Sequence, residues 1–204
     1  MAAITNLTIA NMALSHIGAQ VTLATFPTAA STGIINEAVY LWYDISRRQI
    51  LEAYDWGFAR QRSAILTDHA DVPDDGIWAY RYDLPTDLLA VRRIQNPTNV
   101  GSNAIPYDIE VSLTEGTLSL QTNVDDAIIV YTFDQTDPTF YSDMFTNALS
   151  HLLAANIAYP ITRKRSLKAD HIGLYNRAMP AAAAHDANER VEDEPRDADW
   201  IRLR

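Results

Sequence analysis

Residues 34–66 read IINEAVYLWYDISRRQILEAYDWGFARQRSAIL, and this stretch contains the change of pattern that decides the fold. Up to about Tyr54 the apolar residues recur at helical spacing, so they predict one long, one-sided helix that begins after Ser31 or Thr32. From Trp56 onward the apolar signals become short and alternate with polar residues, which is typical of strands. We therefore expect a helical segment to give way to a β-rich one at this point.

Short strand signals fill the region from Phe58 to Phe133. They are RSAIL, WAYRYDLP, LLAVRRI, IPYDIEV, TLSL and AIIVYTF, separated by turn-forming sequences such as VPDDG and NPTNVGSN. Five of the nine prolines and four of the seven glycines lie between Gly57 and Pro138, as in a segment dominated by turns. This pattern predicts a compact antiparallel β-region of five or six strands.

Helical spacing is also present on both sides of these two regions. Thr5 or Asn6 can cap a first helix, and Gly18 is placed to end it. A third helix is expected to start with Asp137 as its cap and Pro138 in its first position, and to end at Pro160. We expect the fourth helix to run from about residue 165 toward residue 189 and to be kinked or split at its internal proline.

The predicted fold class is α+β, with helix pairs from the two ends of the chain forming a four-helix scaffold. An antiparallel β-domain is inserted between the pairs, and an extended tail follows them. The expected divisions are residues 1–57 and 138–190 for the helical scaffold, 58–137 for the β-domain and 191–204 for the tail.

Composition excludes several classes of protein. The net charge of -10 does not suit a protein that grips nucleic acid, because phosphate contacts need clustered Lys and Arg. No apolar run is long enough for a bilayer, and the first twenty residues resemble a helix more than a signal peptide. The chain has no cysteine, so it can form neither a disulfide nor a thiolate metal site.

Catalytic motifs are missing from the sequence. None of the histidines, His16, His69, His151, His171 and His185, forms HExxH. For His16 and His151, which lie in helical stretches, we prefer a structural role to a metal site assembled from scattered helices. Adjacent acids such as Asp74–Asp75 and Asp125–Asp126 lie in turn-like contexts, which favours solvated turns over a glycosidase pair. GxSxG, P-loop and GxGxxG motifs are absent. We therefore expect a protein that is not an enzyme, with no catalytic residue, metal or cofactor.

Three groups of residues remain as candidates for binding. The aromatic residues of DWGFAR and WAYRYDLP could stack on a ligand, but we prefer core packing for them. A basic cluster between the last two helices is either a solvated helix start or a contact for phosphate or an acidic partner: Arg163, Lys164, Arg165 and Lys168. The acidic tail ends in apolar and basic residues, which favours a docking peptide over a frayed end: Trp200, Ile201, Arg202, Leu203 and Arg204.

Taken in order, these segments resemble one protein family. NMALSHIGA is followed by ILEAYDWGFARQRSAIL, GIWAYRYDLPTDLLAVRRI, LLAANIAYPIT, LYNRAM and a closing DWIRLR. The most specific part is the Trp-x-Phe-Ala motif at Trp56, followed by Tyr-x-Leu-Pro-x-Asp at Tyr82. Over nearly its whole length the chain resembles the tail tubular protein A family, the adaptors of short-tailed (podovirus) bacteriophages.

The resemblance implies a structural virion protein of the viral tail, assembled in the host cytoplasm. Such adaptors are homo-oligomers, with twelve copies expected in a ring between the head portal protein and the tail nozzle protein. DNA passes through the lumen during ejection without specific binding, and no membrane is involved. The helices contact neighbouring subunits and the portal, the β-part faces the nozzle, and the C-terminal tail reaches the portal.

Two other hypotheses remain open on the sequence alone. One is a virion-associated glycan hydrolase, since tails must cross cell envelopes and the chain is rich in acidic residues. The other is a head-closure connector of a long-tailed phage, a class of all-helical proteins that usually lacks a β-insert of this size.

Overall fold

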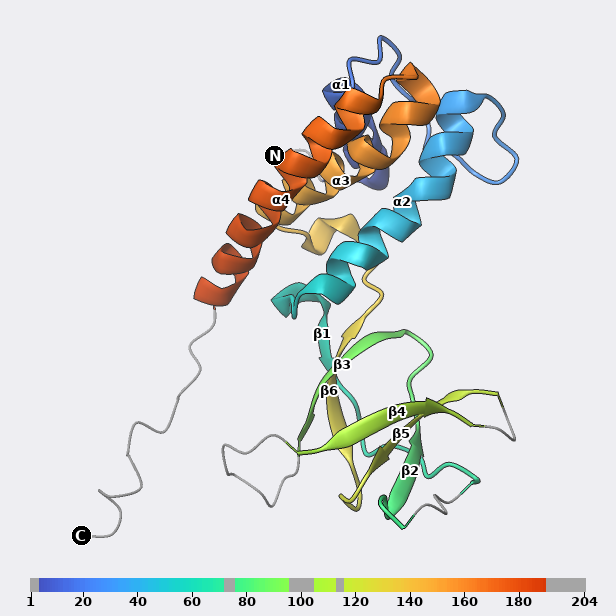
Figure 1. Cartoon of the computed structure of the whole chain (residues 1–204), viewed down its shortest axis with the longest axis vertical. Coiled ribbons are helices and arrows are strands. Elements are labelled where there is room, and N and C mark those ends of the chain that lie inside the picture. Colours follow the sequence, from blue (N-terminus) through green and yellow to red (C-terminus); the bar gives the residue numbers. More distant parts are fainter. Residues whose placement is uncertain (1–3, 72–75, 96–104, 113–115, 190–204) are drawn as a thin grey trace, which may run out of the picture.

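The computed structural model describes residues 4–71, 76–95, 105–112 and 116–189. Within these ranges the chain forms helices at both ends and strands between them, so the predicted α+β class is confirmed (Figure 1). The elements are α1 (Asn6–His16), α2 (Ile34–Ala53), η1 (Gly57–Ala59), β1 (Arg60–Arg62), β2 (Tyr80–Asp83), β3 (Leu88–Gln95), β4 (Tyr107–Val111), β5 (Leu118–Thr122), β6 (Ile128–Phe133), η2 (Pro138–Phe140), α3 (Asp143–Thr162) and α4 (Arg165–Asn188).

The ends of α1 follow the sequence signals. The Thr5 side chain caps the helix by accepting a hydrogen bond from the Thr8 amide at 3.1 Å. Gly18 adopts a positive φ of 71°, and the amides of residues 18 and 19 bond back to the carbonyls of Ser15 and Leu14. This is the Schellman arrangement that favours glycine after a helix. The predictions for this helix are confirmed.

Helix α2 begins one or two residues later than expected. Gly33, not Ser31 or Thr32, occupies the N-cap position, so the helix has no side-chain cap. The first turn is instead stabilised by Glu37, whose carboxylate accepts a hydrogen bond from the Gly33 amide at 3.2 Å. The end of the helix at Ala53 agrees with the predicted end near Tyr54.

The start of α3 differs from the prediction. Asp137 and Pro138 begin only a short 3₁₀ helix, η2. The true cap of α3 is Ser142, whose hydroxyl accepts a hydrogen bond from the Phe145 amide at 3.2 Å. The sequence offers two good caps five residues apart, and the second is used for the long helix because it places Phe145 in the core.

The prediction that Pro160 ends α3 is wrong, and of the kink or split predicted at Pro180 the split does not occur. Pro160 lies inside α3, which continues to Thr162 and ends where Arg163 adopts a left-handed conformation. A proline this close to a helix end removes a bond in a turn that is already ending, so its cost is small. Pro180 does not split α4, which is continuous from Arg165 to Asn188. Beyond Pro180, Ala182 and Asp186 are buried against the rest of the protein, which holds the last turns in place.

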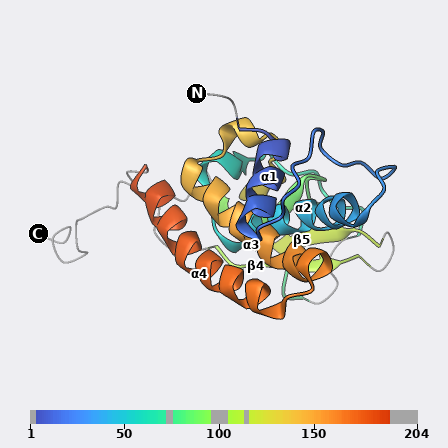
Figure 2. The ribbon, with the colours of Figure 1, turned by 90° about the horizontal axis from the view of Figure 1, so that it is seen from above.

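Helix α3 is the centre of the helical part and packs against the other three helices (Figure 2). Its middle is buried on all sides, as expected for a helix that is surrounded by others. The core also includes Trp56, whose indole donates to the Ile50 carbonyl at 2.8 Å and whose ring packs edge-on against Phe145, with centroids 5.0 Å apart. The preference for core packing of the DWGFAR aromatics is thus confirmed for Trp56.

The strands form two antiparallel sheets, with strand orders β1-β6-β3 and β2-β5-β4. A second hydrophobic core draws residues from both sheets: Leu66, Tyr82, Ile94, Leu120, Ala127, Ile129 and Tyr131. The first strand does not coincide with the RSAIL signal, because β1 covers Arg60–Arg62. Beyond it, Ser63 exchanges hydrogen bonds with Ile129 of β6, and the Leu66 amide donates to the carbonyl of Ala127, just before β6. The other strand signals each correspond to one strand.

Two arginines join the helical part to the sheets. Arg92 on β3 donates through Nη2 to the carbonyls of Leu51, Glu52 and Tyr54, at 3.0, 3.0 and 2.7 Å. The last carbonyl groups of a helix have no partner within the helix, and here the positively charged guanidinium of Arg92 supplies one. Arg47 on α2 binds Asp134, which lies just after β6. Among the described residues, no helix is long and apolar enough to cross a membrane.

Candidate functional site

The residues proposed as a docking peptide, Trp200, Ile201, Arg202, Leu203 and Arg204, lie outside the described part of the chain. The acidic residues Asp74 and Asp75 lie outside it as well. In the described part of the chain the candidate sites are the basic cluster, the histidines and the surfaces of the helices.

The basic cluster lies at the turn between α3 and α4. Arg163 has a positive φ of 60°, and Lys164 precedes the first residue of α4. All four side chains are exposed, and Arg165 lies over the Tyr159 ring with its guanidinium carbon 5.6 Å from the ring centroid. The arrangement is an exposed, basic helix start.

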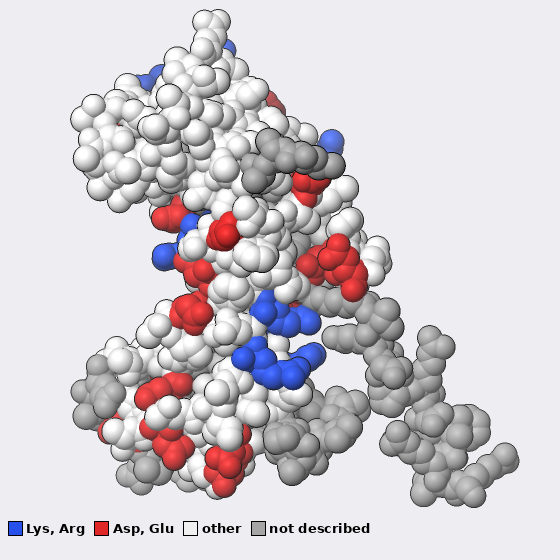
Figure 3. Space-filling view, turned by 180° about the vertical axis from the view of Figure 1, so that it is seen from behind, with Lys and Arg blue, Asp and Glu red and all other residues white. Residues whose placement is uncertain are grey.

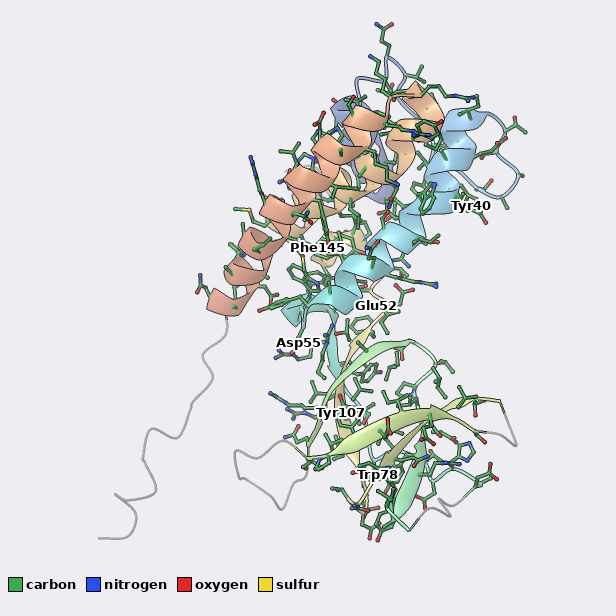
Figure 4. The ribbon with its side chains drawn as sticks, viewed as in Figure 1. Tyr40, Glu52, Asp55, Trp78, Tyr107 and Phe145 are labelled. Carbon is green, nitrogen blue, oxygen red and sulfur yellow. The ribbon has the colours of Figure 1, made fainter. Side chains whose placement is uncertain are left out.

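Helix α2 carries an apolar surface that no other described element covers. Ile34, Leu41 and Ile45 follow one another at intervals of seven and four residues, so they lie on one face of the helix. Their exposed fractions are 59%, 58% and 48%, and the neighbouring Tyr40 is 48% exposed (labelled in Figure 4). We call these four residues the α2 face. Apolar side chains in a row at this exposure mark a surface for contact with another molecule.

An open groove of about 820 Å³ continues the α2 face at its N-terminal end. It lies between the loop after α1 and the start of α2, and its apolar lining includes Val21, Ile34 and Ile161. Val21 is 51% exposed. The groove lengthens the apolar surface that α2 presents.

Helix α4 presents a second exposed surface. Of its 24 residues only His171, Ala182 and Asp186 are buried, and the outward side carries Ile172 and Leu174. In both ribbon views α2 and α4 lie on either side of α3 (Figures 1 and 2). The helical part thus has two different surfaces, facing different directions, that lack a covering element within the described chain.

Three histidines from α1, α3 and α4 stack on one another. The ring centroids of His16 and His151 are 4.3 Å apart, and His171 lies 5.9 and 5.7 Å from them. His16 Nε2 shares a hydrogen bond with the Ser150 hydroxyl at 3.1 Å, and His171 Nε2 lies 3.2 Å from the His16 carbonyl. Burial, and then His171, lower the pKa of His16; burial, and then His16 and His171, lower the pKa of His151.

The stack is the feature that sequence reasoning missed. Its members are separated by up to 155 residues, so no local pattern could have linked them. The described residues include no group of His, Cys, Asp or Glu arranged to hold a metal ion. The stacked rings form a contact between α1, α3 and α4, and Nδ1 of His151 and of His171 is buried without a hydrogen-bond partner in the described structure.

A second polar cluster, near β2 and β4, has some of the residue types of a hydrolase. Ser112 donates to Asp71 at 2.8 Å, while His69 accepts from the Asp71 amide through Nδ1 at 3.0 Å. A nucleophilic serine needs a hydrogen bond to the base that takes its proton. Here the Ser112 hydroxyl is bonded to a carboxylate, and both Ser112 and His69 are buried. This geometry is that of a structural network.

Comparison with known proteins adds no relative. No protein-family model matches the chain, and a search of curated proteins finds no matching sequence.

Proposed function

We propose that the chain is the adaptor subunit of a short-tailed phage, a structural virion protein that joins the head portal to the tail nozzle as a ring. The proposal starts from the whole-chain resemblance to the tail tubular protein A family. The observation that carries it furthest is the presence of two different uncovered helical surfaces, the α2 face and the outward side of α4, on either side of α3.

Two unlike surfaces on one subunit favour head-to-tail contact between copies. A two-fold dimer uses one patch twice, whereas a contact between different patches repeats until it closes into a ring or extends as a filament. In this proposal the helices form a four-helix scaffold that makes the ring wall, with the α2 face of one copy against the α4 side of the next. The number of copies, twelve, comes from the family resemblance.

The remaining parts have separate tasks in this account. The inserted β-domain faces the nozzle protein, and the tail with Trp200 docks on the portal protein. The net charge of -10 disfavours adhesion to DNA, which suits a lumen through which DNA has to pass during ejection. The protein performs no catalysis in this account.

Charge introduced on the α2 face tests the ring. Leu41→Asp combined with Ile45→Asp should leave the fold intact, since both side chains are largely exposed. Burying two carboxylates in a subunit contact is costly, so assembly with the portal protein should weaken at least about 100-fold. The matched control is Val111→Asp on β4, where an apolar residue is 58% exposed outside the helical part. Light scattering that shows equal assembly for the double variant and the control would refute this ring contact.

A further inference from the structure

The basic cluster at the turn between α3 and α4 carries charges that the rest of the protein does not neutralise. Arg163 follows α3, Lys164 is the N-cap residue of α4, and Arg165 and Lys168 lie at the beginning of α4. All four are exposed, and none of them forms an ion pair within the described part of the chain. In a chain with a net charge of -10, this cluster also holds the only two lysines.

Helix α4 itself does not account for these charges. The N-terminal end of a helix carries a partial positive charge, so acidic side chains stabilise its start and basic ones oppose it. Residues 165–168 read RSLK, and in the described structure Lys164 gives α4 no side-chain cap. Lys164 and Arg165 therefore work against the helix that they begin. Local choices that oppose the fold are typical of binding sites.

The basic cluster borders the open groove of about 820 Å³. Ile161, which lines the groove, is two residues before Arg163, at most about 7 Å away along the chain. The loop after α1, the start of α2 and the turn between α3 and α4 lie together at the end of the helical part furthest from the sheets (Figure 1). Figure 3 shows basic side chains at this end, while most of the acidic ones lie nearer to the sheets or on them.

The groove has fixed walls and an uncharged lining. Asn11 on α1 holds the loop that forms one wall, because its Nδ2 donates to the Leu23 carbonyl at 3.1 Å and its Oδ1 accepts from the Leu23 amide at 2.8 Å. The start of α2 forms another wall. None of the described residues that line the groove is charged. Its volume is within the range of roughly 300–1,000 Å³ that is usual for ligand sites, which is enough for a few apolar side chains.

An apolar groove beside unpaired positive charges fits an acidic peptide segment with apolar side chains. A nucleic acid backbone would use the charges but not the groove, since phosphate contacts need no apolar surface. The net charge of -10 also opposes the approach of DNA. A wholly apolar partner would fill the groove and leave the charges unused. Only a segment that combines both chemistries uses the whole site.

We propose that the groove and the basic cluster form one docking site for a segment of another protein, in which acidic side chains flank apolar ones. The apolar side chains enter the groove beside Val21 and Ile161, and the acidic ones pair with Lys164 and Lys168. This inference goes beyond the adaptor function proposed above and does not depend on it. Docking requires a single folded chain and no ring.

A model peptide tests the docking site in the full chain. The probe is a fluorescently labelled synthetic peptide of about 12 residues, with leucines at helical spacing among glutamates. At low ionic strength we expect it to bind at least about tenfold more tightly than the same peptide with lysines in place of glutamates. It should also bind at least about tenfold more tightly than a peptide with serines in place of leucines. Fluorescence anisotropy measures the affinities, and the amide NMR signals of Val21 and Ile161 should shift on binding.

Charge reversal on the protein provides the matching test. Lys164→Glu combined with Lys168→Glu should weaken binding of the glutamate peptide at least about tenfold. The free energy of unfolding should not fall, because acidic side chains suit the start of a helix. The matched control, Arg62→Glu combined with Arg177→Glu, makes the same change in net charge at exposed positions elsewhere and should leave binding nearly unchanged.

Several results would overturn the proposal. Equal affinity for the glutamate and lysine peptides would remove the role of the charges, and equal affinity for the peptide without leucines would remove that of the groove. Shifts at Val21 and Ile161 that appear on raising the protein concentration alone would assign the site to a second copy. A response to inorganic phosphate or duplex DNA, with none to the glutamate peptide, would assign the basic cluster to phosphate. The comparison of peptides decides the matter even if the charge-reversed variant fails to fold.

Discussion

The guanidinium group of Arg47 holds the carboxylate of Asp134 by two nitrogens, with Nε 3.1 Å and Nη2 2.9 Å from Oδ1. Arg47 is on α2 and is 4% exposed, while Asp134 follows β6. The pair therefore holds the segment that leaves the sheets against helix α2. Burial opposes the charged form of Arg47, but the nearby carboxylates of Asp134 and Asp44 raise its pKa overall.

Removing the Asp134 charge should destabilise the protein strongly. In Asp134→Asn the buried Arg47 loses its main counter-charge, and we expect the free energy of unfolding to fall by about 2–4 kcal/mol. Asp44 also contacts Arg47 but is 61% exposed, so Asp44→Asn should cost less than about 1 kcal/mol. Urea unfolding measures both, and equal losses would contradict the role of Asp134.

Arg92 should be as important as the Arg47–Asp134 pair for the junction between the helices and the sheets. Arg92→Met keeps much of the aliphatic stem but leaves the carbonyls of Leu51, Glu52 and Tyr54 without their donor. We expect a loss of about 1.5–3 kcal/mol in the free energy of unfolding and faster amide exchange in the last turn of α2. Arg177→Met on the exposed side of α4 should stay within about 0.5 kcal/mol of the parent. A junction that exchanges no faster in Arg92→Met would show that packing alone holds it.

The histidine stack predicts loss of stability in mild acid. The pKa values of His16 and His151 are lowered from 6.5 in the folded protein, so below pH 6.5 the unfolded chain binds protons that the folded chain does not. Stability should be full above pH 6.5 and should fall as the pH drops from there toward the lowered folded pKa values. His151→Phe keeps a ring against His16 but removes one titrating group. Its unfolding midpoint should fall less between pH 7.5 and pH 5 than that of the parent, and an equal fall would contradict this account.

The docking peptide makes a prediction about the portal. Deleting residues 200–204 should leave the fold unchanged and weaken binding to the portal protein at least about tenfold, because a buried tryptophan anchor supplies much of such a contact. Trp200→Ala should reproduce most of the loss, whereas Arg196→Ala should not. Unchanged affinity after the deletion would refute the docking role of the tail.

Local chemistry in the sequence predicted the elements well. The cap at Thr5, the stop at Gly18 and the alternating strand patterns each depend on residues close by in the sequence. The helix ends and strands that they produce could therefore be predicted. The errors arose where two local signals competed, as with Asp137 and Ser142 for the start of α3, or where a local cost was small, as at Pro160 near the end of α3. The contacts that join the parts could not be predicted. Arg47 and Asp134 are 87 residues apart, and His16 and His171 are brought together only because α1 and α4 both pack on α3.

Electron micrographs of the full chain mixed with the portal protein of the same virus test the adaptor proposal most directly. We predict closed rings of the chain seated on the portal, expected to contain twelve copies, and none when Leu41 and Ile45 are both changed to Asp. Particles in which the portal carries no ring, at concentrations where both proteins are folded, would contradict the account.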